Sequence, residues 1–316
     1  MTAVPQVLDL IQAGTRHLSR AHALAIGRRL GDALFILARS RRRLALANLQ
    51  LALADTLNRA ERRQVGRRVF RHFGEVLVET LLLPDMVADG LERHVRHEGW
   101  EHLQRAVNRG KGAIVFTGHF GNWEVVALAQ GARGIPMDVV GRPPDNRKLA
   151  SRLERVRQMN GNRSIDKHDA VRPMLRSLRD GRTVGLVIDQ NVGAGKGVYV
   201  DFFGHPASTT PALALLALKT GAPVIPVFGY PEAGGHRVVY SPRVEFTSTG
   251  DRTRDVRDLT TRVTKIIEER VREHPDLWLW MHNRWRSRPE TSADRAAPPG
   301  SSPHRDGDAT PTRRVG

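Results

Sequence analysis

From residue 111 onward, short apolar runs rich in β-branched residues alternate with longer segments whose apolar residues recur at helical spacing. The predicted strands are residues 113–117, 137–140, 184–188, 223–228 and 237–246. The predicted helices are residues 123–132, 146–159, 170–180, 211–220 and 255–273. Because strands separated by helices tend to pair in parallel, this order predicts a three-layer α/β domain with a partly parallel sheet.

The two ends of the chain have different patterns. Residues 6–110 are predicted to be helical, because apolar residues recur there at partial amphipathic spacing. Beyond about residue 288 the chain is rich in Pro, Ser, Gly, Asp and Arg without periodicity, which predicts disorder. We therefore expect a helical N-terminal region at 1–110 that packs on the main domain, an α/β domain at 111–288 and a disordered tail at 289–316.

Composition limits the classes of partner and chemistry. The absence of cysteine excludes disulfides, thiolate metal sites and a cysteine nucleophile. The formal net charge is +17, carried mainly by arginine, which binds phosphate through a planar fork and so predicts an anionic partner. No apolar stretch reaches the length of about 18 residues that a transmembrane helix needs. The N-terminus also lacks the pattern of a cleaved signal peptide.

The segment His119-Phe120-Gly121-Asn122-Trp123-Glu124 lies between a predicted strand and a predicted helix. If His119 lies in the loop and Glu124 in the first helical turn, the carboxylate can accept a hydrogen bond from one imidazole nitrogen and leave the other as a general base. Asn122 suits the N-cap position of the helix. Without further context, the alternative is a capped helix with a solvated glutamate.

Asp189 and Gln190 follow the predicted strand 184–188. Polar residues at the carboxyl end of a parallel strand often line a ligand crevice, although a structural carboxylate that caps a loop fits equally well. The glycine-rich stretch 193–197 lacks the first glycine and the Ser or Thr of a phosphate-binding loop. No second ligand lies at zinc spacing from His282, so no metal site is predicted.

Several short motifs together resemble one family, and they extend in order over residues 20 to 290. They are RRLALANL at 42–49, HFGNWE at 119–124, GRPPDN at 141–146, the Arg157-x3-Gly161 pair, DQN at 189–191, FFGHPA at 202–207 and PDLWLWMHNRW at 275–285. The chain resembles the lipid A biosynthesis late acyltransferases (lauroyl and myristoyl transferases) and the related phosphatidylinositol mannoside acyltransferases of the lysophospholipid acyltransferase superfamily.

The resemblance implies an α/β fold of the glycerol-phosphate-acyltransferase type and an O-acyltransferase that uses no cofactor. It implies acyl transfer from an acyl carrier protein or coenzyme A thioester to a hydroxyl of a membrane glycolipid or lysophospholipid. His119 and Glu124 match the family's His-x4-Glu motif and are the expected catalytic pair. The expected substrate-binding residues are Asn122, Arg142, Arg157, Asp189 and Gln190. Arg157 is expected to pair with phosphate on the acceptor or the donor.

Such an enzyme is expected at the cytoplasmic face of the inner membrane, attached peripherally to an anionic surface. Arginines 41–43 and the tryptophan cluster at 278–285 are the candidate anchors, although the tryptophans fit a buried aromatic cluster equally well. Two alternatives remain open. Net charge alone suggests a nucleic-acid-binding protein, but no recognised nucleic-acid-binding signature supports it. A catalytically inert lipid-binding relative is the other, and the intact His119 and Glu124 argue against it.

Overall fold

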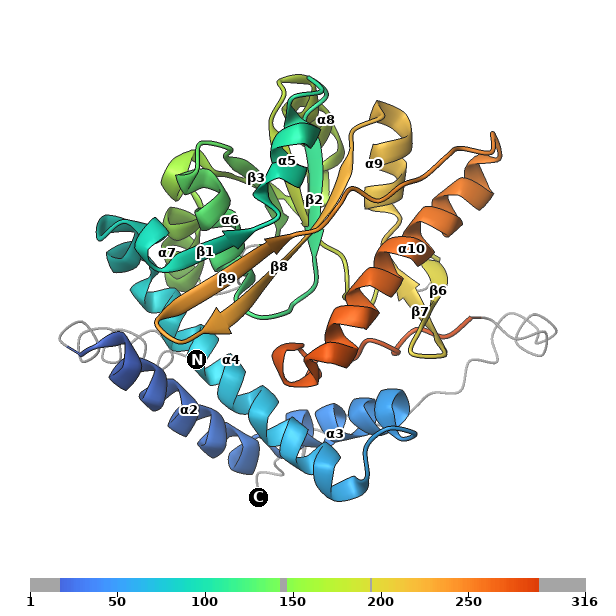
Figure 1. Cartoon of the computed structure of the whole chain (residues 1–316). Coiled ribbons are helices and arrows are strands. Elements are labelled where there is room, and N and C mark those ends of the chain that lie inside the picture. The colour runs from blue at the N-terminus through green and yellow to red at the C-terminus, as the bar shows by residue number, and fades with distance from the viewer. Residues whose placement is uncertain (1–17, 143–146, 194, 290–316) are drawn as a thin grey trace, which may run out of the picture.

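The computed structural model describes residues 18–142, 147–193 and 195–289. Its centre is a seven-stranded sheet in the order β1-β9-β8-β2-β5-β3-β4 (Figure 1). The strands are β1 (Val95–Glu98), β2 (Ala113–Thr117), β3 (Met137–Gly141), β4 (Arg163–Asp166), β5 (Thr183–Val187), β8 (Val224–Glu232) and β9 (Gly235–Tyr240). All neighbours pair in parallel except β8 and β9, which pair antiparallel. The predicted α/β class with a partly parallel sheet is confirmed.

Helices cover both faces of this sheet. They are α5 (Trp100–Val107), α6 (Trp123–Ala132), α7 (Arg147–Arg157), α8 (Val171–Arg179), α9 (Ala212–Thr220) and α10 (Arg252–Glu273). Successive β2 residues point to opposite faces and join different cores. Val115 belongs to the core that contains α5 and α6 residues, whereas Phe116 belongs to the core with α8, α9 and α10 residues. Every residue of β2 is buried, as expected for a central strand covered on both faces.

Three N-terminal helices pack beneath one end of the sheet (Figure 1). They are α2 (Arg20–Leu37), α3 (Arg39–Leu53) and α4 (Arg59–Ala88). A capping box of Asn58 and Glu61 starts α4, because each side chain bonds the backbone of the other. Helices α2 and α4 approach closely at Gly31 and Gly74, where a side chain on either glycine would overlap the backbone of the other helix. No helix in the described part of the chain has the length and hydropathy to cross a bilayer.

Several elements differ from the sequence predictions. Strand β1 lies inside the stretch predicted to be helical up to residue 110, and β9 ends at Tyr240 rather than at residue 246. A separate hairpin, β6 (Val198–Phe202) and β7 (His205–Thr209), was not predicted. Its two turn residues, Phe203 and Gly204, both have positive φ, as a tight two-residue hairpin requires. The predicted disordered tail lies outside the described residues, apart from Pro289.

Candidate active site

A cavity of about 540 Å³ opens where β2, β3 and β5 end. The carboxyl ends of parallel strands meet at one edge of a sheet, which is the usual place for a ligand site in α/β folds. The polar side chains that line it include His119, Arg142 and Gln190, which follow β2, β3 and β5, and Glu124 and Arg157 of α6 and α7. The five residues that we predicted from the sequence therefore line one cavity, although they lie within a stretch of 72 residues, from 119 to 190.

His119 is held by Asp189, which follows the neighbouring strand β5. Its ring Nδ1 lies 2.7 Å from Asp189 Oδ1, and its backbone N–H donates to Asp189 Oδ2 at 2.7 Å. The indole N–H of Trp278 also donates to Oδ2, at 2.7 Å. Burial raises the pKa of Asp189, but the charge of His119 and these hydrogen bonds outweigh it and hold the pKa at about 2. The ionised carboxylate therefore favours the tautomer with the proton on Nδ1.

His119 lines the cavity, and its second ring nitrogen, Nε2, lies on the side of the ring away from the Asp189 bond. The side chain of His119 is 19% exposed, and Gln190 Nε2 lies 3.2 Å from His119 Nε2. With the proton on Nδ1, Nε2 keeps its lone pair and can accept from the Gln190 amide. The same lone pair can accept a proton from a substrate group that enters the cavity, so this arrangement suits a general base.

Glu124 forms a different pair from the one that we predicted. Both of its carboxylate oxygens accept from Arg157 at the end of α7: Nε donates at 3.2 Å and 3.0 Å, and Nη2 donates at 2.5 Å. Burial lowers the pKa of Arg157, but the hydrogen bond and charge of Glu124 outweigh it and raise the pKa. Between these described residues, the expected hydrogen bond from His119 to Glu124 is replaced by two separate pairs, His119–Asp189 and Glu124–Arg157.

The physical reason for this exchange is the register of the sheet. Thr117 of β2 lies opposite Val187 of β5, and Ile188 N–H donates to Thr117 O at 3.2 Å. The two strands therefore deliver His119 and Asp189 to the same place, just beyond their ends. Glu124 lies in the first turn of α6, where Arg157 of α7 pairs with it.

Asn122 is a second correction. It stands at the N-cap position of α6, but its side chain makes no capping bond. Asn122 is 1% exposed, and its amide donates to Glu79 of α4 at 2.8 Å, away from the cavity. We therefore withdraw Asn122 as a substrate-binding residue. Asn122 instead holds the loop through its hydrogen bond to Glu79.

Glu79 of α4 connects α2, α4 and β9 to that loop. Besides Asn122, its carboxylate pairs with Arg20 of α2 and with His236 of β9, whose Nε2 lies 2.8 Å away. Burial raises the pKa of Glu79, but the hydrogen bond and charge of His236 and the charge of Arg20 outweigh it and hold the pKa at about 2. Our sequence reasoning did not identify Glu79, because nothing local to residue 79 marks it as a partner of the motif.

The loop from His119 to Asn122 is also fixed by the C-terminal segment. Gly121 N–H donates to Leu277 O at 2.9 Å, and Leu279 N–H donates to His119 O at 3.1 Å. Gly121 has a φ of 55°, and a Cβ there would stand 1.8 Å from Gly229 O of β8, so only glycine fits. His119 is therefore carried by a loop with little freedom to move.

Two of the three tryptophans at 278–285 are buried and Trp285 is partly buried, so the cluster is an aromatic core rather than an interfacial anchor. Trp278 is 1% exposed and Trp280 is fully buried. Their rings pack edge to face at 4.8 Å between centroids. Arg284 is also fully buried, and its guanidinium donates to Ser208 O at 2.7 Å on the hairpin. The segment thus ties β7 to the loop that carries His119.

Within the described residues, no group of three or more His, Cys, Asp or Glu side chains could hold a metal ion. The polar groups at the cavity are instead arranged as hydrogen-bonded pairs of opposite charge. This arrangement can move one proton through His119 and can present a guanidinium to an anionic group.

The chain was also compared with known proteins. The family model described as bacterial lipid A biosynthesis acyltransferase matches residues 10–287. The lipid A biosynthesis palmitoleoyltransferase of Escherichia coli (strain K12) is 26% identical over 267 residues, which are 84% of this chain and 85% of the relative. The lauroyltransferase of the same strain is 25% identical over 272 residues, with the same coverage.

A phosphatidylinositol mannoside acyltransferase of Mycobacterium tuberculosis (strain CDC 1551 / Oshkosh) is also similar, with 26% identity over 219 residues. These residues are 67% of this chain and 67% of the relative. The relatives thus share acyl transfer as their named activity, and the family match covers the sheet, the cavity and the N-terminal helices. The chain belongs to the bacterial lipid A biosynthesis acyltransferase family.

Proposed function

We propose that this enzyme transfers a fatty acyl chain from a thioester, carried by acyl carrier protein or coenzyme A, to a hydroxyl of a membrane glycolipid. The observation that carries the proposal is the pairing of His119 with Asp189 at the mouth of a largely apolar cavity. The names of the relatives support a glycolipid acceptor, either lipid A-like or a phosphatidylinositol mannoside.

In this mechanism His119 Nε2 removes the proton from the acceptor hydroxyl while Asp189 stabilises the imidazolium. The acceptor oxygen forms a bond to the thioester carbonyl carbon and gives a tetrahedral oxyanion. Collapse of that intermediate breaks the carbon–sulfur bond, and the imidazolium returns its proton to the departing thiolate. Because the chain has no cysteine, no thioester-linked acyl-enzyme can form, and direct transfer is the simplest route.

The Glu124–Arg157 pair supplies positive charge beside that base. Arg157 and Glu124 both line the cavity, and Glu124 holds the guanidinium of Arg157 in place. Arg157 binds an anionic group of one of the substrates, and Glu124 positions Arg157. A guanidinium that is already held in place loses less side-chain freedom when it binds phosphate.

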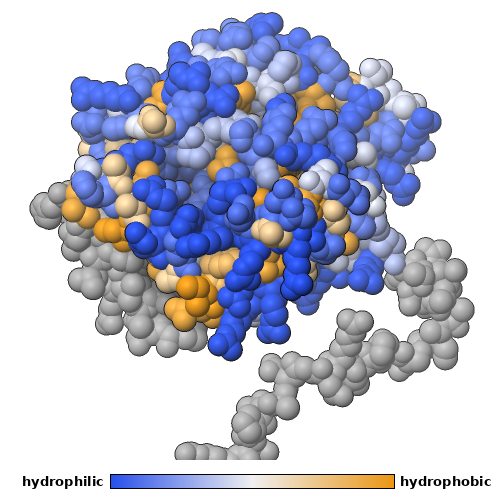
Figure 2. All heavy atoms as spheres, turned by 60° about the horizontal axis from the view of Figure 1, so that its bottom comes forward, coloured by the Kyte–Doolittle hydropathy of each residue, from blue (hydrophilic) through white to orange (hydrophobic). Residues whose placement is uncertain are grey.

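Attachment to the inner face of an anionic membrane is part of the proposal, and it rests on the N-terminal helices. Apolar residues gather among charged ones on the face that carries α2, α3 and α4 (Figure 2). At the end of α2, Ile36 is 64% exposed and Leu37 is 75% exposed, and the exposed Arg41 and Arg43 follow on α3. Exposed apolar side chains beside arginines suit the headgroup layer.

The test is the transfer of a labelled acyl group from acyl-coenzyme A and from acyl carrier protein, with lipid A precursors and phosphatidylinositol mannosides offered as acceptors. We expect an acceptor product heavier by one acyl chain, and its loss in His119→Ala. A matched control is His168→Ala, because His168 also pairs with an aspartate, Asp166, at 2.8 Å, but on the exposed surface. Equal activity of His119→Ala and His168→Ala would remove the general base from the proposal.

A further inference from the structure

The cavity has an apolar arm between α6 and the sheet. Val115, Gly185 and Val139 lie side by side in register on β2, β5 and β3, so they share one face of the sheet. All three line the cavity, and Val126 and Ala127 of α6 line it too. The arm starts beside Thr117, two residues before the catalytic His119.

Met137 is the deepest cavity-lining residue on this face. Met137 pairs in register with Thr183, which lies two residues before Gly185 and therefore on the same face of the sheet. Thr183 pairs on its other side with Ala113. Thr183 and Ala113 are fully buried, whereas Met137 still lines the cavity. The arm therefore ends at the row of Met137. From the row of Thr117 to this row the strand advances four residues, or about 13 Å.

The side chain of Met137 crosses the end of the arm. A Cβ on Gly185 would stand 2.2 Å from Met137 Sδ and 3.0 Å from Met137 Cγ. The thioether of β3 therefore occupies the space that a side chain on β5 would otherwise fill. A glycine in the middle of a central strand often marks such a close approach.

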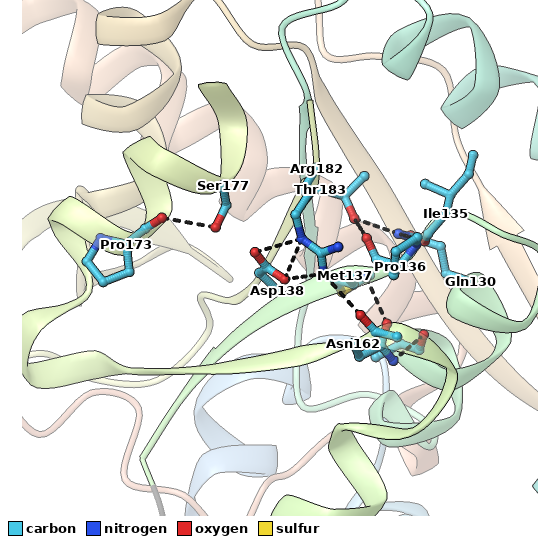
Figure 3. Close-up of polar contacts among 12 residues, drawn as sticks. Gln130, Ile135, Pro136, Met137, Asp138, Asn162, Pro173, Ser177, Arg182 and Thr183 are labelled. Carbon is cyan, nitrogen blue, oxygen red and sulfur yellow. Dashed lines mark hydrogen bonds and ion pairs between the residues drawn. The ribbon is translucent and has the colours of Figure 1, made fainter. Parts of the chain in front are cut away.

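Below Met137 lies a layer of hydrogen-bonded polar groups (Figure 3). Met137 N–H donates to Asn162 Oδ1 at 2.8 Å, and Gln130 Nε2 donates to Thr183 Oγ1 at 2.8 Å. Thr183 Oγ1 in turn donates to Pro136 O at 3.0 Å. An apolar chain that passed this level would break buried hydrogen bonds without replacing them. Only the flexible end of Met137 separates the arm from this floor.

We propose that this arm holds the acyl chain of the donor, and that Met137, seated over Gly185, sets the longest chain that fits. The inference rests on the proposed acyl transfer and adds the residue that determines chain length. The donor carbonyl must lie at His119, so its chain starts where the arm starts. One methylene more or less in an apolar pocket changes selectivity by roughly 10- to 200-fold, which is enough for a sharp length preference.

The experiment offers an equimolar series of unbranched saturated acyl-coenzyme A thioesters to the full chain and measures product chain lengths by mass spectrometry. Met137→Ala removes three heavy atoms from the end of the arm, so the preferred acyl length should increase. The ratio of the products from two acyl chains of adjacent length should change by at least roughly tenfold. Gly185→Ala pushes Met137 into the arm, so the optimum should move to shorter chains.

Met174→Ala is the matched control. Met174 of α8 is as buried as Met137 and lines the same cavity, but it belongs to the core on the opposite face of the sheet. We expect its chain-length optimum to equal that of the wild type. Opposite shifts in Met137→Ala and Gly185→Ala cannot arise from a general loss of stability, because destabilisation would act on both variants in the same direction.

An unchanged optimum in both variants would overturn the inference, as would an equal shift in Met174→Ala. A change confined to the KM for the acceptor would also overturn it, because the arm would then hold an acceptor chain. If the wild type forms no product from acyl-coenzyme A or from acyl carrier protein thioesters, the proposed function fails instead. The length preference is then measured by the binding of non-hydrolysable acyl-coenzyme A thioethers, which Trp123 at the cavity reports by its fluorescence.

Discussion

His119 Nδ1 lies 2.7 Å from Asp189 Oδ1, although 70 positions of the chain separate the two residues. The pairing follows from adjacent parallel strands, β2 and β5, that end in register at the cavity. A third group, Trp278, donates to the same carboxylate and fixes its orientation. His119 is therefore oriented from the neighbouring strand, while Glu124 of its own motif pairs with Arg157.

Asp189→Asn should lower kcat by roughly 10²- to 10⁴-fold, because an amide in that place can no longer enforce the proton on Nδ1 or stabilise the imidazolium. The KM for the acyl donor should change little. Steady-state kinetics measure the effect, with circular dichroism as the control for folding. A kcat near that of the wild type would show that another group orients His119.

Glu124 and Arg157 should act as one unit. Removing either partner leaves the other charge largely buried, so Glu124→Ala and Arg157→Ala should each destabilise the protein by about 3–5 kcal/mol. The double variant should cost less than the sum of the two. A double-mutant cycle from denaturant unfolding measures the coupling, and strictly additive losses would contradict it.

Glu79→Gln should loosen the link between α4 and the catalytic loop. The amide keeps the shape but loses the charge that pairs with Arg20 and His236, so we expect a lower melting temperature together with a lower kcat. Glu75→Gln is the control, because Glu75 lies one turn away on α4 and pairs with the half-exposed Arg28. Similar small effects in both variants would mean that Glu79 does not support the loop.

Stability should fall with acidification from about pH 6.5 towards pH 4, because burial lowers the pKa of His72 to about 4. The unfolded chain binds a proton in this window and the native chain does not, so the native state loses up to roughly 3 kcal/mol relative to the unfolded state. Asp189 and Glu79, whose pKa values are about 2, act only at lower pH, from about pH 4 downwards.

The measurement is the free energy of unfolding as a function of pH for the wild type and His72→Gln. The charged groups that act on the pKa of His72 are unchanged in the variant; they are Asp276, Glu79 and His236. The variant should show a flatter slope between pH 6.5 and 4, while the loss below pH 4 remains. Identical slopes would show that His72 does not titrate on unfolding.

Ile36→Glu with Leu37→Glu should reduce binding to vesicles that contain anionic phospholipid, because these side chains are the most exposed apolar groups at the end of α2. High salt should release only part of the wild-type protein, since apolar insertion resists screening. Cosedimentation over a salt series measures both effects, with neutral vesicles as control. Unchanged binding of the double variant would place the contact elsewhere.

The sequence alone determined the elements whose signals are local. Periodicity and β-branched runs located β2, β3, β5 and the helices between them, and several short motifs, HFGNWE at 119–124 among them, identified the family. Helix and strand periods are properties of neighbouring residues, so they can be read without knowing the fold.

Tertiary structure decided which of these residues meet. Strand order and register brought Asp189 rather than Glu124 to His119, turned Asn122 towards Glu79, and buried Trp278. They also placed Met137 over Gly185, a contact between strands that are 48 positions apart (185 − 137). Such pairings depend on contacts between distant segments, and a one-residue change of register would send every side chain of a strand to the opposite face.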